Sequence, residues 1–323
     1  MKIVESYKQI NKLINSCSNI FVVGHKDLDL DALGACLAIY NYSISANKET
    51  YLIIDDKRSE EAVSKVIKDL KDTVNFVESE KALKIKNGDS LLIVIDTNKD
   101  YLLQNPVLAE AFGTKIVIDH HEQGEGTMGN EKVVVIDTEA SSTCEMMTEF
   151  LKINKFTIDS YLATILLSGI ILDTNNYVLK TDTNTFYYSY YLTTCGANPS
   201  KVQYLLKQDL KKYIKRQKMI TNVKTIANMA VTKGNNDEVY RREELAKTAD
   251  TLLLFNDIEA SFVVARIDKN TVGISARSLG NINVGQLLGM LGGGGNAYEA
   301  AAKVINTTTN KLEKEIINII KLL

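Results

Sequence analysis

Five short apolar runs, each ending in a carboxylate or a histidine, constrain the fold of this chain more than any other feature. They are IFVVGH (20–25), YLIID (51–55), LLIVID (91–96), KIVID (115–119) and KVVVID (132–137). Apolar runs of this length are typical of strands that are buried on both faces of a parallel sheet. Segments with helical spacing, such as 60–72 and 140–153, separate them. The first half therefore predicts an α/β fold with a mostly parallel, doubly wound sheet.

The second half of the chain predicts a helical connector and a smaller α+β domain. Residues 155–220 have mostly helical spacing, and we interpret 202–220 as one connector helix. A helix, a hairpin over 259–278, a glycine-rich loop over 289–297 and a closing helix that begins at the alanines after Glu299 follow. We expect three parts: a catalytic, metal-binding domain over 1–195, a connector over 196–235, and a substrate-binding domain over 236–323.

Charge and cysteine usage exclude several classes of protein. Lys and Arg total 38 against 40 Asp and Glu, so bulk charge does not favour binding of bulk nucleic acid or of an anionic membrane. The four scattered cysteines are typical of reduced thiols. The first sixteen residues contain no apolar core of signal-peptide length, and the most apolar stretch, 163–174, is too short to span a bilayer. We expect a cytoplasmic chain, or the cytoplasmic part of a membrane-anchored protein, with a homodimer as an open alternative.

Histidine placement points to the site of chemistry. All three histidines stand beside carboxylates at the ends of expected strands: His25 opens GHKDLDLDALGA, and His120 and His121 follow Asp119 in VIDHH. In open α/β sheets, ligands bind beyond the carboxyl ends of the strands. We therefore expect these separate segments to meet at one edge of the sheet.

Six side chains are candidate metal ligands. Their mixture of imidazole and carboxylate suits manganese, zinc or iron, and the carboxylate content favours manganese and magnesium. They are His25, Asp29, Asp31, Asp96, His120 and Asp173. Six ligands are too many for one ion that keeps open positions, so they fit two divalent ions that share a bridging carboxylate. Such a pair of ions is the usual apparatus for displacement at phosphorus.

Individual roles follow from position. Asp96 ends a central strand between the other ligand segments, so it is the expected bridge. Asp173 has an alternative role, since an Asp before Thr-Asn-Asn can cap a turn. We expect Asp119 to orient one of the two histidines that follow it. His121 is then either a positioning group or the proton donor to the leaving oxygen.

A second cluster of candidates lies near the C-terminus. Four consecutive glycines allow backbone N–H groups to approach an anion closely, and Arg277 with Ser278 adds a candidate phosphate fork. The alternatives are a flexible turn for the glycines and a solvated surface charge for the arginine. The predicted substrate-binding residues are Arg277, Ser278, Gly292, Gly293, Gly294, Gly295 and Asn296.

These motifs together carry a family resemblance. GHKDLDLDALGA, VIDTN, VIDHH and GIILDT resemble the successive motifs of the DHH phosphoesterase superfamily, and SARSLGNINVGQLLGMLGGGGNAYEAA resembles its DHH-associated C-terminal subdomain. Segments 137–150, 196–216 and 249–266 resemble the phosphodiesterase module of the GdpP-type cyclic di-AMP phosphodiesterases. The resemblance covers nearly the whole chain. It implies two manganese ions, one held by His25, Asp29 and Asp96, the other by Asp31, Asp96, His120 and Asp173.

The chain departs from the family pattern at three places. Asn296 follows the glycine run, where the family normally has His. Glu122 and Gln123 follow the histidine pair, where it has Arg-Arg, and Asn184 stands where Arg is common. These changes remove basic groups from the expected substrate cleft.

Three functions follow as hypotheses. The first is a manganese-dependent phosphodiesterase that hydrolyses cyclic di-AMP to the linear dinucleotide pApA by a two-metal mechanism, with Asp96 and His121 as catalytic residues. The second keeps this chemistry but acts on short oligoribonucleotides or on pAp, as related nanoRNases do. The third is a nucleotide-binding regulator with weakened catalysis, suggested by the missing His and Arg. A DHH-type pyrophosphatase is disfavoured because we find no Ser-Arg-Lys-Lys signature near the C-terminus.

Overall fold

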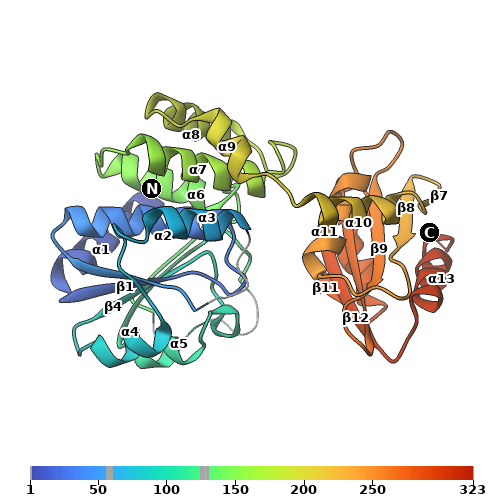
Figure 1. Ribbon diagram of the computed structural model, residues 1–323, viewed down its shortest axis with the longest axis horizontal. Coiled ribbons are helices and arrows are strands. Elements are labelled where there is room, and N and C mark those ends of the chain that lie inside the picture. Colours follow the sequence, from blue (N-terminus) through green and yellow to red (C-terminus); the bar gives the residue numbers. More distant parts are fainter. Residues whose placement is uncertain (1, 56–60, 124–127, 129–130, 323) are drawn as a thin grey trace. The chain divides into compact units, whose positions relative to one another are not determined.

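The computed structural model describes residues 2–55, 61–123, 128 and 131–322, and it divides the chain into two compact units, 1–207 and 208–323 (Figure 1). The division falls between α9 (Pro199–Leu205) and α10 (Leu210–Ile220). The prediction of one helix over 202–220 is therefore wrong, because Asp209 caps a new helix by accepting a hydrogen bond from the backbone N–H of Lys212. The division also differs from the expected boundaries at 195 and 235.

The first unit is built on a parallel sheet of six strands in the order β3-β2-β1-β4-β5-β6. The strands are β1 (Asn19–Val23), β2 (Glu49–Ile53), β3 (Phe76–Val77), β4 (Leu91–Ile95), β5 (Thr114–Asp119) and β6 (Val133–Ile136). Five of them coincide with the five apolar runs, which confirms the predicted doubly wound fold. The strand order reverses between β1 and β4, and such a switch point is where ligands bind in open α/β sheets.

Helices cover both faces of this sheet because alternate residues of a buried strand face opposite sides. Ile20 and Val22 of β1 belong to one apolar cluster, and Phe21 and Val23 belong to another. The first cluster includes residues of α1 (Lys2–Ser16), α2 (Leu30–Ser45), α3 (Glu61–Leu70), α6 (Thr143–Ile153) and α7 (Ser160–Asp173). The second includes residues of α4 (Ser79–Ile85) and α5 (Val107–Ala111), and α8 (Thr183–Thr194) packs on α6 and α7. Among the described residues, no helix combines the length and the apolar content that crossing a membrane requires.

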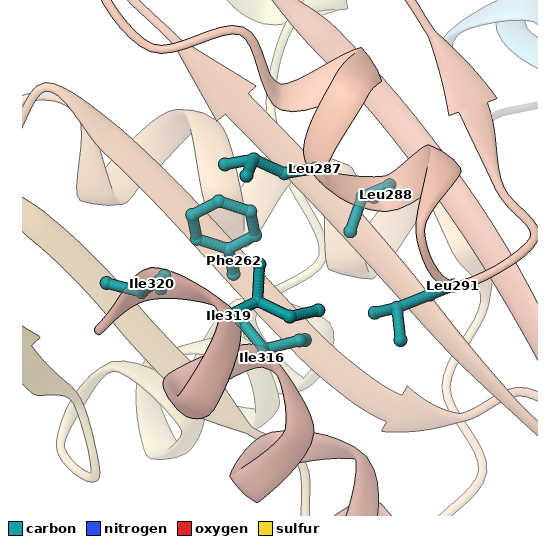
Figure 2. A pocket seen from close by; sticks show the side chains of 7 residues that line it. All are labelled: Phe262, Leu287, Leu288, Leu291, Ile316, Ile319 and Ile320. Carbon is teal, nitrogen blue, oxygen red and sulfur yellow. The ribbon is translucent and has the colours of Figure 1, made fainter. Parts of the chain in front are cut away.

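The second unit has a mostly antiparallel sheet of six strands in the order β11-β12-β10-β9-β8-β7, in which β8 and β9 run parallel. The strands are β7 (Lys224–Ile226), β8 (Met229–Lys233), β9 (Ala260–Arg266), β10 (Thr271–Ser278), β11 (Gly294–Gly295) and β12 (Glu299–Ile305). Residues of α10 and α11 (Arg242–Leu252) pack on one face. Residues of α12 (Val284–Gly289) and α13 (Thr309–Ile320) pack on the other face, where Phe262 lies among leucines and isoleucines with no space for a water molecule (Figure 2).

Two sequence predictions for this unit need correction. The sequence predicts that residues 300–305 begin the closing helix, but they belong to β12, which pairs with β10 from Thr271↔Ile305 to Arg277↔Glu299. Alanine favours helix by itself, but Ala300 and Ala302 are buried on the sheet, so long-range pairing overrides the local preference. Residues 224–233 were expected within the helical connector, and they form β7 and β8.

Close packing of α2 against α7 positions one of the predicted ligands. A Cβ added at Gly169 of α7 would lie 2.9 Å from the Cα of Asp31 and 2.5 Å from the Sγ of Cys144. The Asp31 contact is with backbone, which cannot move aside cheaply. Glycine at this position therefore allows the approach of the helix that carries Asp31.

Gly169→Ala should lower the free energy of unfolding by about 1–3 kcal/mol, the usual cost of overpacking a core, measured by urea denaturation. The helix propensity of alanine acts in the opposite direction, so a net loss would identify the steric conflict. Gly88→Ala is the matched control, because a Cβ there meets nothing within 4 Å. Equal stability of the Gly169 variant and the natural chain would contradict the close approach of these helices.

Candidate metal centre

The six predicted ligands converge at the carboxyl edge of the first sheet, beside the switch point between β1 and β4. Three groups of described residues have ligand atoms that all lie within 4.8 Å of one another: His25 with Asp29 and Asp96, Asp31 with His120 and Asp173, and Asp96 with His120 and His121. His25, Asp96 and His120 follow the ends of β1, β4 and β5, whereas Asp29 and Asp31 lie at the start of α2 and Asp173 is the last residue of α7. Helix ends therefore complete a site that the strand ends begin.

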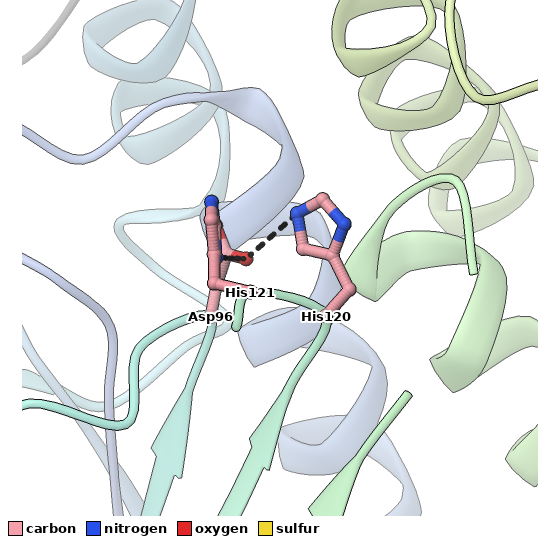
Figure 3. Close-up of side chains that lie close together, drawn as sticks. All are labelled: Asp96, His120 and His121. Atoms are coloured by element: carbon pink, nitrogen blue, oxygen red, sulfur yellow. Dashed lines mark ion pairs between the residues drawn. The ribbon is translucent and has the colours of Figure 1, made fainter. Parts of the chain in front are cut away.

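Asp96 belongs to two of these groups. Its Oδ2 is 3.4 Å from Nε2 of His25, and its Oδ1 is 3.6 Å from Nε2 of His120 (Figure 3). Thr143 donates a hydrogen bond of 2.7 Å from its Oγ1 to Oδ1 of Asp96. The backbone of Asp96 has a φ of 61°, a left-handed conformation that is uncommon outside glycine and concentrated at functional sites. A carboxylate whose two oxygens face different histidines is suited to bridge two ions.

Backbone carbonyls fix which nitrogen of His25 and of His120 faces the carboxylates. Nδ1 of His25 lies 2.5 Å from the carbonyl oxygen of Lys26, and Nδ1 of His120 lies 3.4 Å from that of Ala140. Nε2 of His120 makes no well-oriented hydrogen bond with any residue that the structure describes, although it is buried and Oδ2 of Asp173 lies 3.2 Å away. An unsatisfied buried nitrogen is costly, and a metal ion would satisfy it. Histidine ligands normally hold their second nitrogen in this way.

The N-terminus of α6 holds Asp31. The backbone N–H groups of Thr143 and Cys144 donate hydrogen bonds of 2.8 Å to its two oxygens. Its neighbour Asp29 caps α2, since its Oδ1 accepts a hydrogen bond of 3.0 Å from the N–H of Ala32. These contacts place both carboxylates before any ion binds.

The carboxylates and histidines of the centre perturb one another strongly. Burial, followed by the charges of Asp173 and Asp96, raises the pKa of Asp31 well above its usual range. Burial alone would lower the pKa of each histidine, but Asp29 and Asp96 raise the pKa of His25 well above its ordinary value, and Asp173 with Asp96 raises the pKa of His120 to about 10. Without metal, protons on the histidines therefore balance part of the negative charge. Divalent cations would replace these protons.

Asp119 orients His121 rather than His120. Its Oδ1 lies 2.8 Å from Nδ1 of His121, and its Oδ2 accepts a hydrogen bond of 2.6 Å from Nδ2 of Asn98. The side chain of His121 is 53% exposed, against 4% for His120. Its Nδ1 also lies 3.7 Å from Oδ1 of Asp96. The two adjacent histidines therefore have different environments, one buried among ligands and one open to solvent.

Sequence reasoning did not assign roles to Thr143 and Asn98. Asn98 stood in the motif VIDTN beside Asp96, which was a usable signal. Thr143 lies in the segment 137–150 that carries part of the family resemblance, but only the fold brings the start of α6 to Asp96.

Two of the predicted substrate-binding side chains in the second unit are engaged within that unit. The Nε of Arg277 lies 2.7 Å from Oδ1 of Asp250, and its Nη2 lies 3.6 Å from Oε2 of Glu299. Ser278 is buried, and its Oγ accepts a hydrogen bond of 3.0 Å from the N–H of Gly280. Their role in substrate binding stays a prediction.

The glycine run is partly ordered by strand pairing. Gly294 and Gly295 form β11 and pair with Ala301 and Ala300. Oδ1 of Asn296 accepts hydrogen bonds of 2.8 and 2.9 Å from the N–H groups of Tyr298 and Glu299. Asn296 therefore caps the turn that leads into β12.

Two family profiles match the chain. The DHH family, N-terminal domain, matches residues 19–170, and the DHHA1 domain matches residues 222–322. Each match lies within one of the two compact units.

Curated relatives include two proteins named cyclic-di-AMP phosphodiesterase GdpP. The chain is 35% identical over 95% of its length to that of Geobacillus thermodenitrificans, and 36% identical over 91% to that of Bacillus subtilis. It spans about half the length of these relatives, 48% and 46%. It is also 24% identical, over 88% of its length and 83% of the relative's, to the bifunctional oligoribonuclease and PAP phosphatase NrnA of Thermus thermophilus.

Solved structures share the fold. An exopolyphosphatase-related protein from Bacteroides fragilis has a TM-score of 0.82 at 18% identity, covering 98% of this chain and 95% of that one. RecJ from Thermus thermophilus in complex with Mn²⁺ has a TM-score of 0.56 at 13% identity, covering 99% of this chain and 54% of that one.

His120→Ala should lower the manganese content of the purified chain, because it removes a buried candidate ligand. His121→Ala should leave more manganese bound, because His121 is largely exposed and is held by Asp119. Elemental analysis after dialysis against manganese measures both variants. Equal loss of manganese in the two variants would contradict the assignment of His120, and not His121, as a metal ligand.

Affinity for manganese should rise with pH between about 6 and about 8, because metal binding requires neutral imidazole. The pKa values of His25 and His120 are raised in the metal-free chain, so both rings hold protons at neutral pH and release them on binding. For each proton that is released on binding, the Kd for manganese should fall about tenfold as the pH rises by one unit. Calorimetry in buffers of different ionisation enthalpy counts the protons, and a pH-independent Kd would contradict this account.

Proposed function

The chain belongs to the DHH family, and from that membership we propose that it is a manganese-dependent phosphodiesterase that hydrolyses cyclic di-AMP to pApA. The observation that carries the proposal is that Asp96 belongs to two groups of candidate ligands and faces His25 and His120 with different oxygens. Two relatives that match nearly the whole chain bear the name of this activity. Because the chain spans about half of each, the activity of the chain itself requires measurement.

Each ion has a proposed set of ligands. His25, Asp29 and Asp96 would hold one, and Asp31, Asp96, His120 and Asp173 the other. Divalent ions bound there supply activation of a water molecule and stabilisation of charge on phosphoryl oxygens. The donor set of carboxylates and imidazoles suits manganese, and a RecJ structure with a similar fold was solved with Mn²⁺.

Other residues of the first unit would prepare the site and move a proton. Thr143 fixes the orientation of Asp96 through its hydrogen bond to Oδ1. Asp119 holds Nδ1 of His121, so the exposed ring can present Nε2 to the leaving oxygen and donate a proton there. A carboxylate that fixes the tautomer and orientation of a histidine is a common device for this task.

We propose that the second unit contributes anion-binding groups. Gly292 and Gly294 are exposed, so their backbone can approach a phosphate without obstruction from side chains. Arg277 is already paired with Asp250 and Glu299, so it would have to exchange a carboxylate for a phosphate. Asn296 would add only an uncharged donor, since its Oδ1 caps a turn.

A second candidate function is hydrolysis of short oligoribonucleotides or of pAp. The likeness to NrnA over 88% of the chain favours it. A panel of cyclic di-AMP, cyclic di-GMP, pApA and pAp, incubated with the purified chain and manganese and resolved by chromatography, distinguishes the candidates. We expect cyclic di-AMP to be cut faster than pApA. The reverse order would favour the second function, and tight binding without turnover would favour a regulator.

Asp96→Ala should reduce kcat for cyclic di-AMP on the order of 10³-fold or more, because it removes a ligand from both proposed ions. Initial rates under saturating manganese measure the effect. Asp89→Ala is the matched control: Asp89 is an exposed aspartate just before β4, whereas Asp96 follows the other end of that strand. Near-normal turnover of the Asp96 variant would overturn the two-ion proposal.

A further inference from the structure

An exposed aromatic pair follows the metal ligand Asp173 and has no role in the chemistry described so far. The rings of Tyr177 and Phe186 are stacked, with centroids 5.4 Å apart and planes 21° apart. Phe186 is 58% exposed, while Tyr177 is half-buried against the apolar cluster of the first unit. The pair therefore consists of an anchored inner ring and an open outer ring.

Two connections tie this pair to the candidate metal centre. Tyr177 comes four residues after Asp173, and its N–H donates a hydrogen bond of 3.0 Å to Oγ1 of the buried Thr174. Phe186 lies in the first turns of α8, and α8 packs on α6. The start of α6 also holds Asp31. Four residues limit the Cα separation of Asp173 and Tyr177 to about 14 Å, which a dinucleotide can span.

The backbone holds Tyr177 in one place. Asn175, Asn176 and Tyr177 have φ values of 45°, 59° and 64°, a left-handed conformation that is an outlier for a bulky residue. Two hydrogen bonds of 2.8 and 2.9 Å, from the N–H groups of Val178 and Leu179 to the carbonyl of Thr174, close this turn. Tyr177, the inner ring of the pair, is thus part of a defined turn at the end of α7.

We propose that the exposed face of Phe186 stacks on a nucleobase of the substrate, with Tyr177 as its rigid support. The inference rests on the proposed function, because it requires a nucleotide substrate. Aromatic side chains bind bases by stacking without regard to sequence, since every base has a π-face. Such a platform would orient a dinucleotide whose phosphate lies at the ligands around Asp96.

Docking of another protein is the competing use of this surface. The exposed aromatic face of α8 continues to Tyr187 and Tyr190, which are 44% and 66% exposed. A protein partner would use this whole face, whereas base stacking depends on Phe186. Tyr190→Ala is therefore a matched control on the same helix.

The test is equilibrium binding of a pApA analogue that carries 2-aminopurine, whose fluorescence is quenched by stacking. The natural chain with manganese should quench it, and Phe186→Ala should weaken binding about tenfold, equivalent to about 1.4 kcal/mol. Phe186→Tyr should restore binding, and Tyr190→Ala should bind as the natural chain does. An abasic analogue should bind equally to the natural chain and to Phe186→Ala.

Unchanged quenching in Phe186→Ala, or an equal loss in Tyr190→Ala, would overturn the platform. The measurements test the proposed function separately from the platform. Quenching that depends on Phe186 without hydrolysis would leave the platform standing and remove the proposed activity. Hydrolysis of cyclic di-AMP together with binding that does not depend on Phe186 would support the proposed activity and overturn the platform.

Discussion

Three buried or partly buried carboxylates, those of Asp31, Asp96 and Asp173, share a small volume with the partly buried His25 and the buried His120. The rest of the site depends on how this charge is held. Burial, followed by the repulsion of the neighbouring carboxylates, raises the pKa of Asp31. The chain offsets this cost with hydrogen bonds aimed at the carboxylates and with protonated histidines. Divalent cations are the natural replacement for those protons.

Different helices and strands supply the histidines and the hydrogen-bond donors that surround these carboxylates. The strand order places the ends of β1, β4 and β5 side by side, so His25, Asp96 and His120 meet. The N-terminus of α6 provides two N–H donors for Asp31, which also benefits from the positive end of the helix dipole. Gly169 allows α7 to approach α2 closely. The site is therefore organised by packing before any ligand is present, as a catalytic centre requires.

Much of this organisation could be predicted from the sequence, because buried parallel strands and polar strand ends leave local patterns. The strand β12 could not, since its alanines favour helix locally and only pairing with β10 makes them a strand. The break between α9 and α10 depends on one capping aspartate, Asp209, inside a helical pattern. The hydrogen bond of Thr143 to Asp96 joins residues 47 positions apart, and no spacing rule reveals it. The motif residues were visible in the sequence, whereas the residues that hold them came from tertiary packing.

The most direct test of the central claim is the number and coupling of bound manganese ions. Titration of the metal-free chain, followed by electron paramagnetic resonance, reports both quantities. Two ions per chain with a spin-coupled spectrum are expected if Asp96 is shared between them. A single ion, or two ions without magnetic coupling, would contradict a centre built around one bridging carboxylate.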